Sequence, residues 1–407
     1  MRVLMVSQFY PPVVGGQERH VRTLSVGLVG RGHEVDVVTT AVTPGDVGVD
    51  DDEGVRVHRV RTTMQRLPGV YQDPARAHAI PLSDPVVARW VSTRLARGRY
   101  DVVHAHDWMV GATLGPARRA KVPILYTLHD YSHLCTTKRL MRDDRVCGGP
   151  GLARCVRCAA RQHGALVGAG LVGANLVAHR LRARGVARFI PVSSAVARGA
   201  ELEPGSYEVI PNFIGEDLVE PHLPVHPDGP VVFVGDLTRD KGVEVLVEAY
   251  RGLVAPPPLV LAGRQFDHTP IRIPPNGRLA GVLPYREVLS LIASASVVVV
   301  PSIVADCCPT VVLEAMAKGR PVIGAASGGI ADLVEDGVTG VLVPPGDPGA
   351  LAKAMANVLE DHGRAASMGA AATRRVRGFT GAAVIGRIEN LYARVAAAPV
   401  SQGDPRS

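Results

Sequence analysis

Short apolar runs alternate along most of this chain with stretches in which apolar residues recur at helical spacing. The first run, Val3–Ser7, is followed by Val21, Leu24 and Leu28, and then by a second run, Val35–Thr40. Apolar residues three and four apart share one face of a helix, whereas a short continuous run is typical of a buried strand. This order predicts a βαβ unit, and therefore a parallel sheet with helices packed on its faces.

The alternation occurs twice, on either side of a proline-rich stretch at 221–230. Strands of the first half are expected at Val3–Ser7, Val35–Thr40, Val55–Val60, Asp101–His104, Pro123–His129, Arg188–Val192 and Glu208–Pro211. Strands of the second half are expected at Val231–Gly235, Leu259–Gly263, Arg278–Gly281, Val297–Pro301, Pro321–Ala325 and Gly340–Val343. We therefore predict two doubly wound α/β domains, 1–220 and 221–381, then a helix at 382–399 that packs back on the first domain and a disordered tail at 400–407.

The composition agrees with this organisation and excludes several classes of protein. The chain has 407 residues and 46% of them are apolar, so it is neither a disordered protein nor a small disulfide-stapled scaffold. No apolar run approaches the length of about 20 residues that spans a bilayer, and the first residues lack the long apolar core of a signal peptide. We therefore expect the protein in the cytoplasm.

Positive charge is concentrated in one segment. The formal net charge is +7, and the segment 145–198 contains nine arginines but no aspartate or glutamate. Because aromatic residues make up only 4% of the chain, a stacking platform for nucleic acid is not expected. A basic surface for phosphates, for an anionic membrane or for an acidic acceptor remains open.

Part of this segment, Gly164–Leu181, is apolar on almost every side and merges into a run of arginines at 180, 182, 184 and 188. Two interpretations remain open. The segment is either a helix buried between the domains with a polar end, or a face that contacts the inner surface of a membrane peripherally.

Polar motifs stand where strands of such sheets end, and ligands of doubly wound domains bind at that edge. Gly15-Gly16 opens the first helix, where N–H groups can meet a phosphate, although a plain tight turn gives the same pattern. Lys241, with Arg239 two residues before it, opens the first helix of the second half. It could neutralise a diphosphate, or it could be a solvated loop lysine.

Two acidic residues follow a later strand. Asp306 lies in a predicted strand-to-helix loop, and Glu314 lies about one turn into the helix that Pro309 begins. Carboxylates so placed can accept hydrogen bonds from the hydroxyls of a sugar and a ribose. Gly329-Ile330 opens a further helix after a glycine loop and offers a second set of N–H groups.

These motifs, in their order and spacing, resemble the retaining glycosyltransferases of glycosyltransferase family 4, the glycosyl transferases of group 1. The resemblance runs from 11–21 (PPVVGGQERHV) through 32–35 (GHEV) and 210–212 (IPN) to 337–343 (GVTGVLV), and the segment 314–324 (EAMAKGRPVIG) is especially similar. It implies the GT-B fold, in which two Rossmann-like domains face each other across a crevice.

The resemblance also implies roles for individual residues. His129, Lys241 and Asp306 would act on the reacting groups, as the sugar contact, the diphosphate-binding cation and the first acidic residue of the family's E-x7-E motif. The further donor contacts would be Gly15 and Gly16 at the phosphate, Arg239 beside Lys241, Glu314 at the ribose, Gly329 and Ile330 at the sugar or phosphate, and Val282 and Leu283 at the base.

The sequence departs from the family pattern at two positions. Asp306 is one methylene shorter than the usual glutamate, and Asp236 stands five residues before Lys241, where the family usually has an arginine. An acid beside a diphosphate would repel it. We expect Asp236 to turn away and Arg239 to substitute for the missing arginine; the alternative is weak donor binding.

The implied function is retaining transfer of a hexosyl group from a nucleoside diphosphate sugar, UDP- or GDP-linked, to an acceptor hydroxyl. The product would belong to glycan, glycolipid or natural-product biosynthesis, and no cofactor is expected to be required for the chemistry. Two alternatives with the same fold remain, a catalytically weakened nucleotide-sugar-binding protein and a nucleotide-sugar 2-epimerase. The sequence does not specify the base, the sugar or the acceptor.

Four of the six cysteines lie close together in a predicted insertion at 135–158, namely Cys135, Cys147, Cys155 and Cys158. The closing C-x2-C is a common zinc spacing. A structural zinc, reduced or redox-active thiols, and disulfides all remain open, although a cytoplasmic compartment disfavours disulfides. A separate acidic run, Asp50–Glu53, superficially resembles a metal motif, and we interpret it as a solvated turn.

Overall fold

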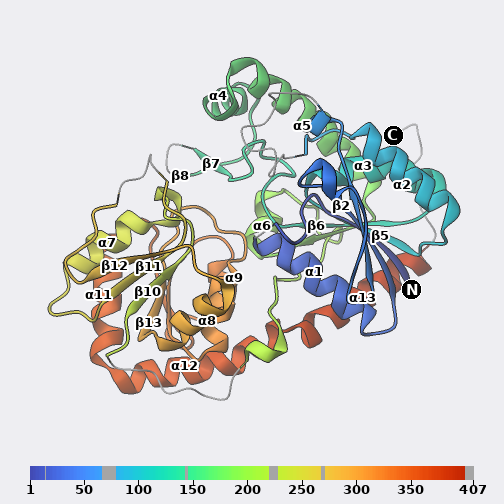
Figure 1. Ribbon diagram of the computed structural model, residues 1–407. Coiled ribbons are helices and arrows are strands. Elements are labelled where there is room, and N and C mark those ends of the chain that lie inside the picture. Colours follow the sequence, from blue (N-terminus) through green and yellow to red (C-terminus); the bar gives the residue numbers. More distant parts are fainter. Residues whose placement is uncertain (14, 67–78, 143–144, 220–227, 267–270, 399–407) are drawn as a thin grey trace.

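Two parallel sheets with helices on their faces form the two lobes of the molecule (Figure 1). This computed structural model describes residues 1–407 except 14, 67–78, 143–144, 220–227, 267–270 and 399–407. The predicted α/β class with two Rossmann-like doubly wound domains is confirmed. The predicted tail at 400–407 lies outside the described residues.

The N-terminal sheet has the strand order β3-β4-β2-β1-β5-β6-β9, and its neighbours are parallel except for the hairpin of β3 and β4. Its strands are β1 (Arg2–Val6), β2 (Glu34–Thr40), β3 (Gly48–Asp52), β4 (Val55–Val60), β5 (Val102–His106), β6 (Ile124–Leu128) and β9 (Arg188–Pro191). Its helices are α1 (Gly16–Val29), α2 (Pro85–Arg97), α3 (Gly111–Ala120), α4 (Leu152–His163), α5 (Ala165–Gly185) and α6 (Ser194–Gly199). A small ribbon of β7 (Met141–Arg142) and β8 (Arg145–Val146) precedes α4.

The C-terminal sheet has the order β12-β11-β10-β13-β14-β15, the strand order of dinucleotide-binding domains. Its strands are β10 (Val231–Val234), β11 (Leu259–Ala262), β12 (Gly277–Gly281), β13 (Val297–Val300), β14 (Val322–Ala325) and β15 (Gly340–Val343). Its helices are α7 (Val243–Arg251), α8 (Tyr285–Ser294), α9 (Thr310–Ala317), α10 (Ile330–Leu333), α11 (Pro348–Glu360) and α12 (His362–Val376).

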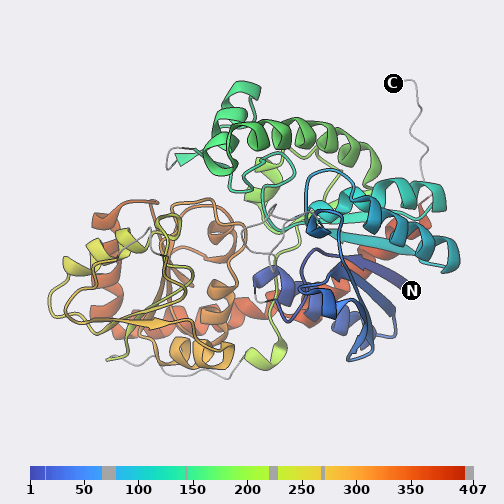
Figure 2. The same cartoon turned by 45° about the horizontal axis from the view of Figure 1, so that its top comes forward.

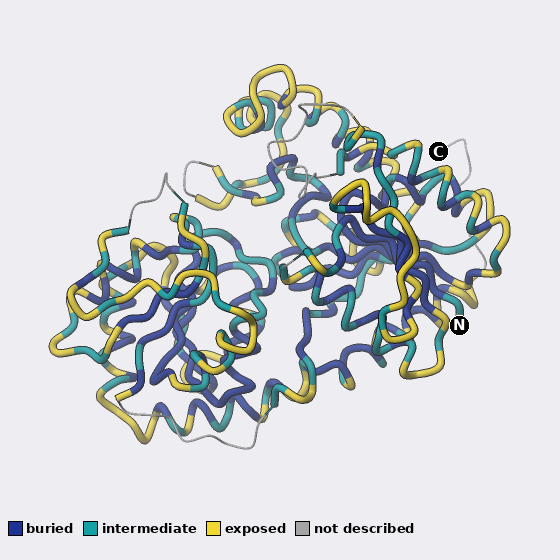
Figure 3. The backbone as a smooth tube through the Cα atoms, viewed as in Figure 1, coloured by how far each residue is buried: buried dark blue, intermediate teal, exposed yellow. Residues whose placement is uncertain are grey.

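The central strands of both sheets are buried because helices cover each face, whereas the edge strands β3 and β12 are largely exposed (Figure 3). In β13 all four residues are valines and all four are buried, as expected for a central parallel strand. In each sheet the strand order reverses beside the first strand, between β1 and β5 and between β10 and β13. A doubly wound sheet binds its ligands at this reversal, beyond the carboxyl ends of the strands.

The chain crosses between the domains twice, and the two crossings are bonded to each other. The Ile214 amide donates to the Phe379 carbonyl at 3.0 Å, and the Gly381 amide donates to the Ile214 carbonyl at 3.0 Å. The last helix, α13 (Gly381–Ala397), then packs on α1 and β5 of the N-terminal domain. Its side chains Ile388 and Tyr392 are buried in the core of that domain.

Two local predictions are wrong. The segment 208–211 is not a strand, although the Glu208 and Ile210 amides do bond to β9 carbonyls. Prolines at 191 and 211 remove the amide donors that a continuous ladder needs. The acidic run Asp50–Glu53 is not simply a solvated turn, because its first three residues belong to β3 and Asp52 accepts hydrogen bonds from the Arg22 guanidinium at 2.7 and 2.8 Å.

Candidate active site

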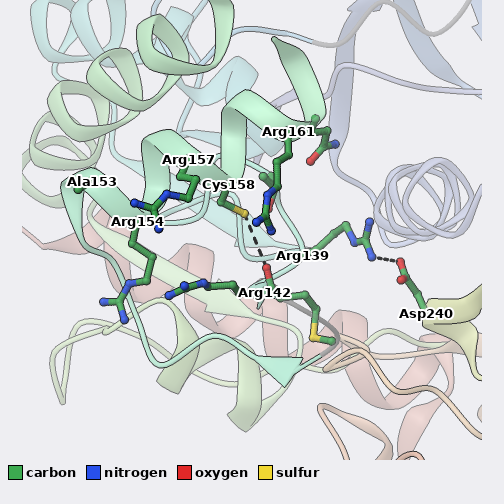
Figure 4. Close-up of a pocket in the computed structure, with 11 residues that line it drawn as sticks. Arg139, Arg142, Ala153, Arg154, Arg157, Cys158, Arg161 and Asp240 are labelled. Atoms are coloured by element: carbon green, nitrogen blue, oxygen red, sulfur yellow. Dashed lines mark hydrogen bonds and ion pairs between the residues drawn. The ribbon is translucent and has the colours of Figure 1, made fainter. Parts of the chain in front are cut away.

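The two domains touch across the crevice through side chains that lie beyond the strand ends. The amide and hydroxyl of Ser194 donate to the Asp332 carboxylate at 2.6 and 2.7 Å, and the Asn212 side chain donates to the Cys308 carbonyl at 2.9 Å. An ion pair of Arg139 with Asp240 also joins the domains (Figure 4). Loops from both sheets therefore form the two walls of one site.

On the C-terminal wall, Lys241 and Asp306 form an ion pair. The Lys241 ammonium donates to the Asp306 carboxylate at 2.7 Å, and the Ser302 hydroxyl donates to the same carboxylate at 3.0 Å. Burial alone would lower the pKa of Lys241, but the Asp306 carboxylate outweighs it and raises that pKa. The lysine is therefore a fixed cation at the edge where β10 and β13 end.

Gly242 fixes the position of this lysine. Its φ is +73°, and a Cβ there would lie 1.9 Å from the Pro301 carbonyl oxygen. Only glycine adopts this conformation without strain and also admits the close approach. The loop after β10 is therefore held directly against the loop after β13, which brings Lys241 to Asp306.

Glu314, in α9, is buried and has two polar partners. The Tyr285 hydroxyl donates to it at 3.2 Å, and the Arg19 guanidinium lies 3.4 Å away, across the crevice from α1. Burial raises the pKa of Glu314, while Arg19 and Tyr285 act in the opposite direction. Val282 and Leu283 lie in the loop just before Tyr285, and Val282 is 74% exposed.

Besides Arg19, the N-terminal wall contributes a cluster of imidazoles. His106 Nδ1 lies 2.9 Å from His129 Nε2, and the His20 ring lies edge-on to the His129 ring with centroids 4.9 Å apart. His104 completes the cluster and bonds to the Tyr392 hydroxyl of α13 at 2.6 Å. These rings come from α1, β5 and the end of β6.

The cluster is uncharged at neutral pH. Burial lowers the pKa of His104 and of His129 to about 3, and the neighbouring histidines act in the same direction. Burial also lowers the pKa of His20 and His106 well below the ordinary value. Neutral imidazoles can donate and accept hydrogen bonds to sugar hydroxyls without carrying charge.

The predicted glycine loops lie on both walls. Gly16 begins α1, and a Cβ on it would meet nothing within 4 Å, so the fold itself does not require glycine there. Gly15 precedes it as the cap residue. Gly329, which caps α10 before Ile330, is packed: its amide donates to the Asp306 carbonyl at 2.6 Å, and a Cβ would lie 2.1 Å from the Cys307 carbonyl.

Asp236 is turned toward Arg264 rather than toward Lys241. The Arg264 guanidinium lies 3.3 Å from the Asp236 carboxylate, so a cation from the end of β11 compensates the acid at this position. The Arg239 side chain, which we expected to substitute for the family's arginine, is 60% exposed and 3.9 Å from Glu244. The geometry thus places Arg264, not Arg239, at Asp236.

Comparison with known proteins decides which family this site belongs to. Residues 15–212 match the family described as "Glycosyl transferase 4-like domain", and residues 229–361 match "Glycosyl transferases group 1". The two matches cover both domains in the order that the fold requires.

The chain belongs to the group 1 glycosyltransferases.

Relatives of this glycosyltransferase match over nearly its whole length. A D-inositol 3-phosphate glycosyltransferase of Corynebacterium diphtheriae is 27% identical, over 99% of this chain and 96% of that protein. A glycogen synthase of Mycobacterium tuberculosis is 29% identical, over 92% of this chain and 90% of that protein.

Solved structures share its fold. A sucrose-phosphate synthase from Thermosynechococcus elongatus superposes with a TM-score of 0.72 at 22% identity, covering 97% of this chain and 99% of that one. The Anabaena protein Alr3699/HepE, in complex with UDP-glucose, gives 0.67 at 20% identity, covering 97% and 100%. The GT-B fold is thereby shown.

Several residues that contact the site were missed in the sequence of this glycosyltransferase. They are Arg19, His20, His106, Asn212, Arg264 and Tyr285. The sequence contained a signal for His106 alone: it lies two residues after His104 in a predicted strand, so the two side chains share a face. The others come together only in the tertiary structure.

The four clustered cysteines carry free thiols in the structure. All six thiols are free, and the described residues contain no group of three or more His, Cys, Asp or Glu placed to hold an ion. Burial raises the pKa of Cys158, and the thiols of Cys135, Cys147 and Cys155 are near enough to raise it further. The disulfide alternative finds no support, and structural zinc stays a prediction, to be checked by metal analysis of the purified protein.

The helix predicted at 164–181 is not buried between the domains. It forms α5, which lies with α4 on the outside of the N-terminal domain (Figure 2). Its inner face carries Asn175 and the buried Arg182, which bonds to the His133 carbonyl at 2.9 Å, while Leu166 is 91% exposed. Among the helices that the structure describes, none is long and apolar enough to cross a membrane.

Proposed function

We propose that this glycosyltransferase moves a hexosyl group from a nucleoside diphosphate sugar, UDP- or GDP-linked, to an acceptor hydroxyl with retention of the anomeric configuration. The observation that carries the proposal is the Lys241–Asp306 pair at the strand ends, opposite the neutral His129. A cation suits a diphosphate and an uncharged ring suits a sugar. The UDP-glucose complex of the similarly folded Anabaena protein supports a donor of this kind.

In the proposed reaction, the bond between the anomeric carbon and the diphosphate oxygen breaks, and the acceptor oxygen bonds to the same face of that carbon. The acceptor proton passes to the departing diphosphate oxygen. Lys241 and the N–H groups at Gly16 stabilise the charge on the leaving group, and His129 orients the sugar. Asp306 and Glu314 each lie beside a cation, so we assign them hydrogen bonds to the donor rather than nucleophilic attack.

A thermal-shift panel of nucleoside diphosphates and their sugars tests the donor site. A bound ligand raises the apparent stability by mass action. We expect a shift for one base that Lys241→Ala and Glu314→Gln abolish and that Arg89→Gln, on the exposed side of α2, preserves. A panel without any shift contradicts the proposal.

Product analysis then separates the alternatives. Incubation of the donor that gives a shift with candidate acceptors should yield a glycoside whose anomeric configuration, read by NMR, matches that of the donor. Donor binding without transfer or hydrolysis would identify a nucleotide-sugar-binding protein. Inversion at the sugar C2 would identify an epimerase.

We further propose that the protein works in a reducing, cytoplasmic compartment and contacts the inner face of an anionic membrane through α5. The apolar Leu166, Val167, Leu176, Val177 and Leu181 are exposed on this helix, and Arg180 and Arg184 near its end are exposed as well. Apolar residues beside cations suit an interfacial helix. The variant L166Q/L176Q should lose binding to phosphatidylglycerol vesicles in flotation; unchanged binding, or none by the unaltered protein, contradicts this contact.

A further inference from the structure

Two histidines of the imidazole cluster are bonded directly to each other. His106 is the last residue of β5, and His129 follows directly after β6, the neighbouring parallel strand (Figure 1). Thr127 is the register partner of His106, so His129 lies two residues further along and its side chain comes to the same face of the sheet. The sheet thereby holds His106 Nδ1 at 2.9 Å from His129 Nε2, with the two rings stacked at 24°.

This contact contains a single proton. Both rings are uncharged, because burial lowers the pKa of His129 to about 3 and that of His106 well below its ordinary value. A neutral imidazole has one N–H and one bare nitrogen. Either His106 Nδ1 donates to His129 Nε2, or His129 Nε2 donates to His106 Nδ1. Each choice fixes the tautomer of both rings.

The surroundings of His106 favour the first choice. Its other nitrogen, Nε2, is buried and has no hydrogen-bond partner in the part of the chain that the structure describes. If His106 Nδ1 accepted, the proton of the ring would lie on Nε2 as a buried N–H without an acceptor. In protein interiors an orphaned N–H is rarer than an unsatisfied acceptor. We therefore place the proton of His106 on Nδ1, where it has a partner.

The two other rings of the cluster show that this choice is particular to His106. His104 has a partner on each nitrogen, the Tyr392 hydroxyl at 2.6 Å and the Thr127 hydroxyl at 2.6 Å. His20 has none on either nitrogen among the described residues, so it buries an unpaired N–H in both tautomers. His106 has a partner on one side only, and its own tautomer therefore decides whether its N–H is paired.

Asn212 agrees with the same assignment from the other side of His129. It lies beside His129 and acts to raise the pKa of that histidine. Its amide nitrogen donates to the Cys308 carbonyl at 2.9 Å, whereas its amide oxygen is buried and has no hydrogen-bond partner among the described residues. Asn212 therefore offers His129 an acceptor. A His129 ring whose Nε2 is occupied by His106 meets that acceptor with an N–H on Nδ1.

We propose that His106 is a positioning residue that holds His129 in the tautomer with its proton on Nδ1, so that His129 presents an N–H donor to the sugar. The sugar would then meet His129 through an oxygen that accepts a hydrogen bond. The role toward the sugar rests on the proposed function, whereas the tautomer rests on the contacts of His106 and Asn212 alone.

Nitrogen-15 spectra of the histidine rings at pH 7 test the tautomer, because a ring nitrogen that carries a proton and a bare one differ widely in chemical shift. The signals of His129 are identified by their absence in H129Q. We expect the proton of His129 on Nδ1 in the unaltered protein. A proton on its Nε2 overturns the proposal. Because this spectrum already distinguishes the two tautomers, the outcome does not depend on the stability of any His106 variant.

Three substitutions test whether His106 causes the tautomer. H106L removes the donor and keeps an apolar side chain, so the Nδ1 tautomer of His129 should lose its dominance. H106N, whose amide can donate from the place of the imidazole Nδ1, should restore it. H58L is the matched control, because His58 is a buried imidazole in β4, which β2 and β1 separate from β5. An unchanged tautomer in H106L, or the same change in H58L, overturns the positioning role.

Steady-state kinetics relate the tautomer to the reaction. H106L should lower kcat by up to about tenfold, no more than His129→Ala does, and H106N should recover most of it. In a His129→Ala background H106L should change kcat by less than about twofold, because both substitutions remove the same interaction. Losses that multiply in the double variant overturn the positioning role. An Nδ1 tautomer in a protein that transfers no sugar would contradict the proposed function and leave the tautomer assignment standing.

Discussion

The two walls of the crevice differ in the kind of polar side chain that they present. The C-terminal wall holds a full charge at Lys241 and carboxylates at Asp306 and Glu314, whereas the N-terminal wall holds histidines that burial keeps neutral. The first arrangement suits a charged diphosphate, and the second suits an uncharged sugar. Removing the charge from one wall and removing a hydrogen bond from the other should therefore have effects of very different size.

The largest effect should follow loss of the cation. Lys241→Ala should lower kcat about 10²- to 10³-fold, because the leaving diphosphate would lose its preorganised positive charge. Lys241→Arg, which keeps the charge, should retain part of the activity. Steady-state kinetics together with a thermal unfolding scan would test this. A loss below about threefold in a folded Lys241→Ala protein would show that the charged wall does not act on the leaving group.

A smaller effect is expected on the neutral wall. His129→Ala should lower kcat about tenfold, the size of one neutral hydrogen bond. Because the pKa of His129 is about 3, the histidine should contribute no ionisation to the kcat profile between pH 5 and 8. A profile with a histidine-like inflection that disappears in His129→Ala would contradict an uncharged imidazole cluster.

A glycine-to-alanine substitution on each wall tests the stability of the fold rather than the rate of the reaction. Gly242→Ala should destabilise the fold by at least about 1–2 kcal/mol, because its left-handed backbone leaves a Cβ 1.9 Å from the Pro301 oxygen. Gly16→Ala should change stability by less than about 0.5 kcal/mol yet weaken donor binding, since space around it is open. Urea unfolding and the thermal-shift panel measure the two effects, and equal destabilisation by both variants would refute the distinction.

The neutral wall should also make the protein sensitive to acid. The unfolded state takes up protons on His104 and His129 below about pH 6.5, while the folded state resists until about pH 3, so stability should fall as the pH decreases through this range. Each such histidine contributes about 1.4 kcal/mol per pH unit. Buried Asp107, whose pKa burial raises to about 7, works in the opposite direction. Equal unfolding free energies at pH 7 and pH 4.5 would contradict this balance.

The sequence predicted the sheets well because their strands are dense in valine and stand between turn signals. Helices such as α3 and α12 were not predicted, since α3 contains Pro116 and α12 is rich in alanine and glycine, which blurs the apolar period. The C-terminal wall was predictable from the sequence because Lys241, Asp306 and Glu314 lie in local motifs. The imidazole cluster was not, because His20 and His106 meet His129 only after α1, β5 and β6 have packed together.

The orientation of Asp236 likewise depends on tertiary packing that the sequence motifs do not show. An acid near a diphosphate was visible in the sequence, but its partner, Arg264, is 28 residues away at the end of the neighbouring strand. Parallel strands bring such residues together through register, which a motif does not encode. The exposed apolar face of α5 was likewise ambiguous, since a uniformly apolar helix does not say which side meets the protein.

The last helix has a consequence for how the protein is made. α13 places Val384, Ile388 and Leu391 in the N-terminal core and bonds Tyr392 to His104. A ribosome releases these residues after everything else in the two domains. The domain that is synthesised first is therefore completed last. The surface of α1 and β5 that α13 covers stays exposed to solvent while the second domain is synthesised.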